Sequence, residues 1–182
     1  LWEPPSVITR NWELDLHKLF PIIFTWNDKY VNENKYIKIF WPQTRKFIDV
    51  PSIDFKHKKL LVNISMNKSS NHPRELYSER LNSIRYFEHN HTDNFDLFGV
   101  GWDNPTTGVN IKNTKHIEKH PSYRGTILNK WDVLPKYRFS LCYENIYDEP
   151  GFITEKIFDC LRAGCVPIYW GAPNIKDYVD EN

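Results

Sequence analysis

The sequence has no long hydrophobic run and almost no net charge. No window of its 182 residues approaches the roughly 20 consecutive apolar residues that a membrane-spanning helix needs, and no signal-peptide pattern opens the chain. The formal net charge is +1, so the composition gives no sign of a surface for nucleic acid or an anionic membrane. An apolar fraction of 40%, with 15% aromatic residues, indicates a globular protein with a core large enough to fold.

Two further absences limit disulfide and metal chemistry. Cys142, Cys160 and Cys165 form no C-x-x-C pair, which argues against a zinc site or a disulfide framework and favours buried thiols. No Asp-x-Asp motif occurs, so we expect no obligatory metal ion or other cofactor, while stimulation by Mn²⁺ or Mg²⁺ stays open. The sequence also has no initiator Met, and we expect it to be a fragment of a longer protein.

The most informative stretch is residues 138–173, RFSLCYENIYDEPGFITEKIFDCLRAGCVPIYWGAP. Short apolar runs at 139–143 and 166–170 predict two strands. Apolar residues between them recur at helical spacing, with Thr154 as the N-cap and Gly164 as the stop. Two strands joined by one helix are expected to be parallel and to cross right-handedly. The pattern therefore predicts a βαβ unit.

Polar residues gather at one end of this unit. In an open parallel sheet, ligands bind beyond the carboxyl ends of the strands, where loops and helix N-termini meet. That edge carries Glu144, Asn145, Thr154, Glu155 and Lys156. A helix N-terminus attracts phosphate, a first-turn lysine adds a full positive charge, and a carboxylate can accept hydrogen bonds from ribose hydroxyls. The structural alternative is a first-turn glutamate that favours the helix dipole beside a solvated lysine.

The run CYEN…GFITEKIFDCLRAGCVPIYWGAP resembles the donor-binding signature of the α1,3/4-fucosyltransferases, which are inverting GT-B enzymes that use GDP-fucose. The resemblance implies an α/β fold of GT-B type. Residues 56–182 would form a Rossmann-like, parallel-sheet donor-binding domain, incomplete here. Residues 1–55 would form a linker and the end of a truncated N-terminal acceptor domain.

The resemblance also assigns roles to the polar edge. It implies that Asn145, Glu155 and Lys156 bind the donor and that Glu144 and Thr154 lie in contact with it. Phe152 is a further candidate contact. Some bacterial relatives have a tyrosine at that position, so any contact through a hydroxyl is lost in this chain, although the ring can still pack on the sugar or the base.

The N-terminal residues predict the tail of an α/β unit. A short helix is expected near 14–20 and a buried strand at 22–26, while the composition of 27–51 indicates loop and linker. Glu3, in LWEPPS, occupies the position of the family's proposed catalytic base. An inverting transfer needs a carboxylate to take the acceptor's proton as its oxygen attacks the sugar. Apart from the resemblance, Glu3 is a loop glutamate near a terminus.

The middle of the chain predicts the first half of the donor domain. Residues 59–66, KLLVNISM, form an apolar run of strand length, and a helix is expected at about 75–88. Arg80 falls within the helix's apolar arc, where a charge needs a partner. A carboxylate, a strand-end carbonyl or a diphosphate would each serve. Fucosyltransferases carry a phosphate-binding arginine in this helix, so the resemblance implies that role for Arg80.

Residues 95–136 give three weaker predictions. FDLFGVGW at 95–102 predicts a strand and a glycine turn, and 130–136 predicts a short helix. Residues 106–120 are polar and irregular. Their two histidines, His116 and His120, have no metal-ligand companions at useful spacing, so we expect solvated loop residues.

As partners, the resemblance implies GDP-fucose as donor and a GlcNAc-containing glycan as acceptor, fucosylated at the 3- or 4-hydroxyl. It implies no nucleic-acid partner, and any membrane association would come through segments outside this sequence. A eukaryotic protein would lie in the Golgi lumen, and a bacterial one in the cytoplasm or at the membrane periphery. Two alternatives stay open: a GT-B transferase for another nucleotide sugar, and an inactive carbohydrate-binding fragment.

Overall fold

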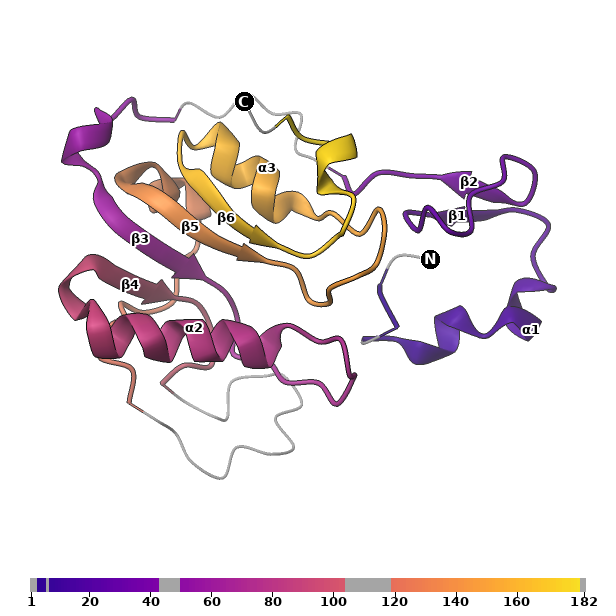
Figure 1. Ribbon diagram of the computed structural model, residues 1–182, viewed down its shortest axis with the longest axis horizontal. Coiled ribbons are helices and arrows are strands. Elements are labelled where there is room, and N and C mark those ends of the chain that lie inside the picture. The colour runs from indigo at the N-terminus through magenta and orange to yellow at the C-terminus, as the bar shows by residue number, and fades with distance from the viewer. Residues whose placement is uncertain (1–2, 6, 43–49, 104–118, 181–182) are drawn as a thin grey trace.

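The computed structural model describes residues 3–5, 7–42, 50–103 and 119–180 (Figure 1). The α-helices are α1 (Leu14–His17), α2 (Tyr77–Asn90) and α3 (Glu155–Arg162). The strands are β1 (Ile23–Thr25), β2 (Tyr36–Lys38), β3 (Lys59–Ile64), β4 (Phe95–Phe98), β5 (Tyr137–Tyr143) and β6 (Val166–Trp170). Short 3₁₀ helices span Thr9–Trp12, Phe55–His57, Thr92–Asn94, Lys130–Asp132, Leu134–Lys136 and Ile175–Asp177.

The larger sheet has four parallel strands in the order β4-β3-β5-β6. From β3 the chain moves to β4 on one side, and it then crosses to β5 on the other side of β3 (Figure 1). The strand order therefore reverses between β3 and β5, and their carboxyl ends meet at one edge. This all-parallel α/β architecture agrees with the predicted donor-binding domain of a GT-B enzyme.

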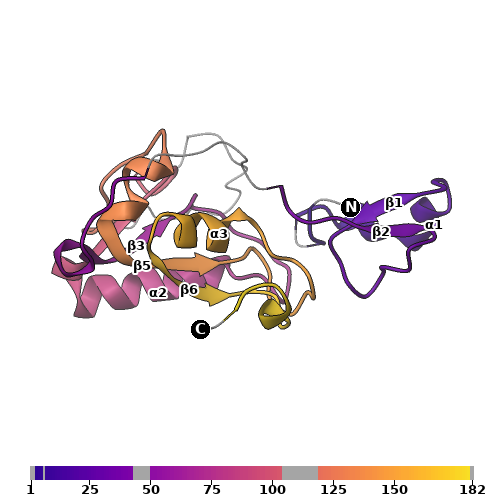
Figure 2. The ribbon, with the colours of Figure 1, turned by 90° about the horizontal axis from the view of Figure 1, so that it is seen from above.

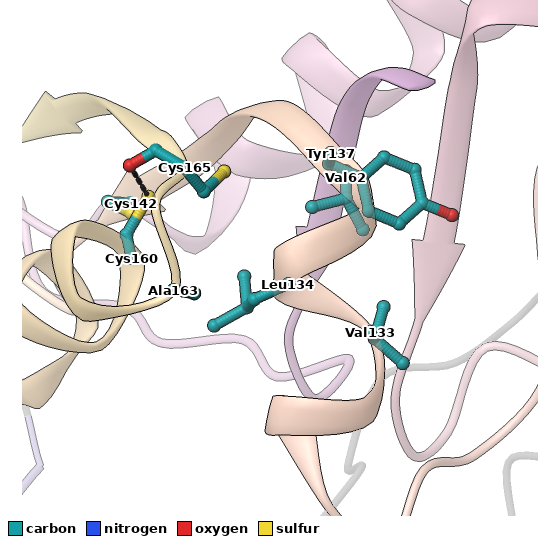
Figure 3. Close-up of a cluster of buried hydrophobic side chains, with 8 residues drawn as sticks. All are labelled: Val62, Val133, Leu134, Tyr137, Cys142, Cys160, Ala163 and Cys165. Carbon is teal, nitrogen blue, oxygen red and sulfur yellow. Dashed lines mark hydrogen bonds between the residues drawn. The ribbon is translucent and has the colours of Figure 1, made fainter. Parts of the chain in front are cut away.

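Helices α2 and α3 cover opposite faces of this sheet (Figure 2). On the α2 face, Ile84 packs in a buried cluster with Leu61, Phe95, Leu97, Trp102 and Leu141. On the α3 face, residues from β3, β5, α3 and the 133–137 turn form a second cluster (Figure 3). The central strands β3 and β5 thus contribute alternate side chains to two cores, as a parallel sheet with helices on both sides requires.

The predicted βαβ unit at 138–173 is confirmed, because β5 and β6 pair in parallel on either side of α3 in the sequence. Thr154 occupies the N-cap position of α3, although its own side chain caps no main-chain group. Gly164 follows the helix with φ of +62°, and Cys165 N–H donates to Cys160 O over 3.0 Å. Glycine tolerates this left-handed conformation, so the chain can leave the helix there.

The prediction of buried thiols is also confirmed. Cys142, Cys160 and Cys165 are free and buried, and the Cys160 thiol donates to Cys165 O over 3.2 Å (Figure 3).

Helix α2 starts two residues later than the sequence predicted, because Glu75 caps it from outside. The Glu75 carboxylate accepts the main-chain N–H of Tyr77 at 2.5 Å and that of Ser78 at 3.0 Å. These N–H groups have no partner within the helix, and a negative charge there also favours the helix dipole. The predicted apolar arc is confirmed, since Tyr77, Arg80 and Ile84 are the buried residues of α2.

The N-terminal segment forms a small parallel sheet of its own, β1 beside β2, with Ile23 opposite Tyr36 (Figure 1). Strand β2 lies within 27–51, so the prediction of loop and linker throughout that range is wrong at 36–38. The strand has three residues and is flanked by asparagine and lysine, too short a pattern to stand out. Its structure depends on pairing with β1.

Two smaller expectations need correction. Residues 130–136 form two 3₁₀ turns rather than one helix, because Pro135 in the second turn has no N–H to donate. His120 is not solvated: its side chain is 5% exposed, and its Nδ1 lies 2.9 Å from the Glu88 carboxylate. His116 and most of that stretch lie outside the described residues. The predicted domain boundary between 55 and 56 stays a prediction.

Candidate functional site

A pocket of about 330 Å³ opens at the carboxyl edge of the four-stranded sheet. We call it the edge pocket. It is lined by Ile64, Ser65 and Met66 at the end of β3, Gly99 and Val100 after β4, Ser140, Leu141 and Cys142 in β5, Glu155, Lys156 and Asp159 in α3, and Thr126, Ile127, Lys130 and Leu134 from the segment before β5.

The edge pocket lies where the strand order reverses. Its lining comes from the strands β3 and β5 that flank the reversal, and from the first turn of α3. In open parallel sheets this is the position at which ligands bind, because the two following loops diverge and leave a crevice. Its volume also falls within the range of small-molecule sites.

Behind the pocket, Glu144 organises the start of α3. Its carboxylate accepts the main-chain N–H of Thr154 at 2.8 Å, the Thr154 hydroxyl at 2.8 Å and the Lys156 ammonium at 3.0 Å. Glu144 is completely buried, and a buried carboxylate is tolerated when its oxygens accept several hydrogen bonds and face a cation. We call Glu144, Thr154 and Lys156 the α3-start cluster.

Gly171 allows this arrangement. A Cβ atom at that position would lie 2.5 Å from Glu144 Cγ and 2.6 Å from the Tyr169 hydroxyl oxygen. A larger residue would push the glutamate out of line with the helix. The glycine is therefore required by a close approach and not by an unusual backbone conformation.

Lys156 and Glu155 are the two predicted donor-binding residues that line the edge pocket. Lys156 Nζ also donates to the Thr154 hydroxyl over 2.8 Å, and its side chain is 28% exposed. Glu155 is half-buried beside it, in the first turn of the helix. The structure thus brings Glu144, Thr154, Glu155 and Lys156 together, as the sequence predicted for this edge.

Arg80 approaches the same strand end from the opposite face. Its guanidinium donates to Tyr143 O over 2.8 Å and to Glu144 O over 3.2 Å. Of the partners considered from the sequence, these are the strand-end carbonyls. Burial lowers the pKa of Arg80 below its ordinary value, and the nearby charge of Glu144 is among the groups that oppose this. Arg80 thus holds the main chain from which the Glu144 side chain extends.

Two other predicted donor contacts lie apart from the pocket. The Asn145 carbonyl accepts the Leu76 N–H over 3.1 Å, which fastens the β5–α3 loop to the start of α2. Phe152 is 1% exposed, and its ring centroid lies 4.7 Å from that of Trp26 and 6.0 Å from that of Trp41. Phe152 packs between the N-terminal segment and the main body, where its ring is covered by protein.

Glu3 is half-buried, and its carbonyl accepts the indole N–H of Trp12 over 3.0 Å. Its carboxylate lies within electrostatic reach of Tyr77, one turn before Arg80 in α2. Burial raises the pKa of Tyr77 to about 12, Arg80 opposes the rise, and the negative charges of Glu3 and Glu75 add to it.

The N-terminal segment is attached through a second polar cluster, Asp28, Lys38, Asn174 and Tyr178, which we call the joint. Lys38 Nζ donates to Asp28 Oδ1 over 2.5 Å, and Asp28 Oδ2 accepts from Tyr178 over 2.7 Å and from Asn174 over 3.0 Å. Burial favours the neutral form of Asp28, but these three hydrogen bonds outweigh it and hold the pKa of Asp28 below its ordinary value.

Sequence reasoning missed several residues of the edge pocket, among them Ser65, Gly99 and Lys130. Gly99 has φ of +131°, and a Cβ there would lie 1.9 Å from Ser65 O, so the turn after β4 can be this tight only with glycine. The GVG run was the available signal for this approach. Lys130 forms an ion pair with Asp159 of α3, 29 residues later, which no local pattern reveals.

Within the described ranges, the structure contains no group of three or more histidine, cysteine, aspartate or glutamate side chains arranged to hold a metal ion. In the same part of the chain, no helix combines the length and apolar character needed to cross a membrane.

Comparison with known proteins points to one family. The sequence profile described as "Glycosyltransferase family 10 (fucosyltransferase) C-term" matches residues 55–182. Alpha-(1,3)-fucosyltransferase FucT of Helicobacter pylori is 43% identical over 53 residues, which is 29% of this chain and 11% of that protein. GDP-fucose protein O-fucosyltransferase 3 of Rattus norvegicus is 32% identical over 87 residues, which is 48% of this chain and 16% of that protein.

The chain therefore spans a small part of these relatives' own length. Among solved structures, one described as alpha1,3-fucosyltransferase with GDP aligns with a TM-score of 0.49 and 17% identity, over 88% of this chain and 50% of that one. A second, described as alpha1,3-fucosyltransferase with GDP-fucose, aligns with a TM-score of 0.45 and 19% identity, over 71% of this chain and 30% of that one.

Proposed function

Because the chain belongs to glycosyltransferase family 10, the fucosyltransferase family, we propose that it carries the donor site of an enzyme that transfers L-fucose from GDP-fucose. The finer proposal is an inverting transfer to the 3- or 4-hydroxyl of GlcNAc in a glycan. Residues 56–182 would bind the donor, and residues 1–55 would be the end of the acceptor domain. One observation carries the proposal: the edge pocket lies at the reversal of strand order and is lined by Glu155 and Lys156.

The start of α3 supplies suitable chemistry for a nucleoside diphosphate. The first-turn N–H groups and the helix dipole favour phosphate, and Lys156 adds a formal positive charge. Its ammonium donates two hydrogen bonds within the α3-start cluster and has three hydrogens, so one is left for a phosphate oxygen. Glu155 is placed to accept hydrogen bonds from the ribose hydroxyls.

Glu144 offsets the positive charge of Lys156. With Glu144 ionised, it and Lys156 together carry no net charge, so phosphate would be attracted by the helix terminus and by the unshared ammonium donor. The buried carboxylate also fixes Lys156 in one position, which lowers the entropy cost when a ligand binds.

Arg80 remains a proposed phosphate ligand. Its guanidinium has five N–H donors, and the two carbonyl contacts of its Nη2 atom do not use them all. A second, structural function follows from those same contacts, since loss of Arg80 would release the strand end that carries Glu144. Both functions predict weaker donor binding, and the structural one also predicts lower stability.

Glu3 is the proposed general base. As the acceptor oxygen attacks the anomeric carbon of fucose, Glu3 would take the hydroxyl proton, the bond to the diphosphate would break, and GDP would leave. The place of Glu3 in LWEPPS, which resembles that of the family's proposed base, supports the proposal.

The relatives favour a second acceptor class. Several are GDP-fucose protein O-fucosyltransferases, including the rat protein that aligns over 87 residues. Under this alternative the donor site is unchanged and the acceptor is an oxygen atom of a protein. Product analysis with a free glycan and a folded protein acceptor separates the two.

A ligand comparison tests the donor assignment. The melting temperature of the 182-residue chain is measured with GDP, UDP and CMP at equal concentrations. A ligand at 100 times its Kd adds about 2.7 kcal/mol to the stability of a protein. Stabilisation by GDP well above that by UDP and CMP is the expected result. Equal or absent stabilisation by GDP would contradict a GDP-fucose site and leave a transferase for another nucleotide sugar, or an inactive fragment.

A further inference from the structure

A second hollow opens at the end of β6. Its volume is about 450 Å³, and its walls come from the loops that follow β5 and β6. Tyr147 and Asp148 belong to the first loop. Tyr169 and Trp170 end β6, and Gly171, Ala172, Pro173 and Ile175 come after it. Gly171 lies in this wall and packs against Glu144, and the Glu144 carboxylate accepts a hydrogen bond from Lys156 in the lining of the edge pocket.

The walls of this hollow are aromatic, and the exposed part of Trp170 is large. Trp170 is 41% exposed, although it packs edge-on against Tyr143 with centroids 5.6 Å apart. The Tyr147 ring lies 6.2 Å from Trp170 at an angle of 40°. An exposed indole beside a second ring forms an apolar surface to which a ligand with a flat apolar face can bind.

The loop that carries Tyr147 is held in place by hydrogen bonds to main-chain carbonyl oxygens. The Asp148 N–H donates to Gly171 O over 3.2 Å, the Tyr147 N–H donates to Arg74 O over 3.0 Å, and Arg74 Nη1 donates to Asp148 O over 2.9 Å. Asp148 has φ of +58°, a conformation that aspartate adopts more readily than most residues. The hollow is therefore formed before any ligand arrives.

The charge at this hollow disfavours anionic ligands. Among the residues that line it, Asp148 is the one with a charged side chain, and that side chain is 62% exposed. Arg74 is the nearby cation, with Nη1 3.8 Å from the Asp148 carboxylate, but Glu149 and the Asp148 carbonyl also hold it. A phosphate would meet a carboxylate without a dedicated positive partner, so a nucleotide is disfavoured.

We propose that this hollow binds a neutral pyranose ring of the acceptor glycan. The C–H groups on one face of a pyranose carry partial positive charge and can pack on the electron-rich face of Trp170. Ring hydroxyls can donate charge-assisted hydrogen bonds to Asp148. The assignment of the sugar to an acceptor rests on the proposed function, because Glu144 links the wall of this hollow at Gly171 to Lys156 of the proposed donor pocket.

This placement has a consequence for the enzyme. The loop from Glu144 to Thr154 would carry the α3-start cluster on one side and the sugar platform, Tyr147 and Asp148, on the other. Donor and acceptor would then be positioned by two faces of one rigid loop. Acceptor selection would be shared between the N-terminal part of the enzyme and this chain's Trp170.

The test uses the 182-residue chain and N-acetyllactosamine as the probe. Indole N–H resonances are followed by NMR during titration, and the Trp170 resonance is assigned by its loss in Trp170→Phe. We expect the probe to shift the Trp170 resonance. Trp170→Ala should weaken binding about fivefold to tenfold, and Asp148→Asn, which keeps the backbone conformation, about threefold or more. Tyr86→Ala removes an exposed ring from α2 and serves as the matched control.

The outcomes separate this inference from the proposed donor site, because GDP binding is measured on the same samples. If the wild-type chain binds GDP but the probe leaves Trp170 unshifted, or both variants bind the probe as tightly as the wild type, the sugar platform is wrong. A shift of Trp170 by guanosine in place of the sugar would also overturn it. If the probe binds through Trp170 while GDP fails to bind, the platform stands and the donor assignment falls.

Discussion

The α3-start cluster and the joint are both polar clusters, but they differ in how far apart their members lie in the sequence. In the α3-start cluster, Glu144 meets Thr154 and Lys156, which are 10 and 12 residues away in the chain. In the joint, Asp28 meets Asn174 and Tyr178, which are 146 and 150 residues away. Short connections can be recognised from a local pattern, whereas long ones form only when separate segments fold against each other.

The clusters also differ in burial. Glu144 is fully buried, while the Asp28 side chain keeps 31% of its surface exposed. A buried charge that loses its partners is far more costly than an exposed one, because solvent cannot replace the lost interactions. We therefore expect changes in the α3-start cluster to affect the whole fold, and changes in the joint to affect mainly the attachment of the N-terminal segment.

The largest predicted effect is on catalysis and concerns the N-terminal segment. In the full-length enzyme, Glu3→Gln should lower kcat by about 10²- to 10⁴-fold, the usual contribution of a positioned general base. Affinity for GDP should stay within about twofold of wild type, since the proposed donor site lies in the other region, and kcat and kcat/KM should fall together. Steady-state kinetics over a range of pH check this.

A matched control is Glu13→Gln, also in the N-terminal segment and exposed. If Glu3→Gln keeps more than about a tenth of wild-type turnover and the acidic limb of its pH–rate profile, Glu3 is not the base.

Glu144→Ala comes next. The substitution removes a buried carboxylate that accepts hydrogen bonds from Lys156 and from the Thr154 N–H. Because these groups then lose their partner, we expect the free energy of unfolding to fall by about 3–5 kcal/mol. Urea denaturation measures it. Glu155→Ala alters the neighbouring carboxylate in the same loop–helix unit, and because Glu155 is half-buried it should cost much less. If Glu144→Ala and Glu155→Ala lowered the free energy of unfolding equally, the greater burial of Glu144 would not make its carboxylate more important for stability.

Lys156→Ala should weaken GDP binding by about 1–3 kcal/mol, the range for a charge-assisted hydrogen bond. The loss should fall toward the upper end, because removal of the ammonium also leaves the Glu144 carboxylate to repel phosphate. Calorimetric titration gives the affinity. Lys136→Ala, near the start of β5 and outside the pocket lining, is the control. Unchanged affinity in Lys156→Ala would remove Lys156 from the donor site.

The smallest effect is expected at the joint. Asp28→Asn keeps the shape but loses the charge that Lys38 faces, and stability at neutral pH should fall by about 1–2 kcal/mol. The folded pKa of Asp28 lies below its ordinary value, so its contribution is present above about pH 4 and is lost as the pH falls through the depressed pKa.

The difference in stability between wild type and Asp28→Asn should therefore be constant near neutrality and should narrow below about pH 4. Thermal unfolding across this range measures it. Asp96, whose pKa is also held low, is present in both proteins and cancels in the comparison. A difference that widens in acid would mean that Asp28 is not stabilised as the carboxylate.

The contrast between the clusters explains how far the sequence could predict the structure. The βαβ unit, the buried face of α2 and the gathering of Glu144, Thr154, Glu155 and Lys156 follow from periodicity and from the topology of parallel sheets. Strand β2 could not be predicted, because three residues carry too little pattern. The packing of Trp26 against Phe152 could not be predicted either, since Trp26 lies 126 positions earlier in the chain.

Arg80 shows the same limit in one side chain. Its position on the apolar arc predicted that it needs a partner, and the helix pattern placed it correctly. Which partner it takes depends on how α2 lies against the end of β5, a tertiary fact. The sequence therefore predicted that Arg80 needs a partner, and the structure identifies the carbonyl oxygens of Tyr143 and Glu144 as partners.

We propose that the donor nucleotide binds in the edge pocket. Amide resonances of the 182-residue chain followed by NMR during titration with GDP test it most directly. We expect saturable shifts at Ser65, Gly99, Glu155 and Lys156, and little change at Tyr86 on the outer surface of α2. Shifts that cluster elsewhere, or none at these four residues when GDP is bound, would contradict it.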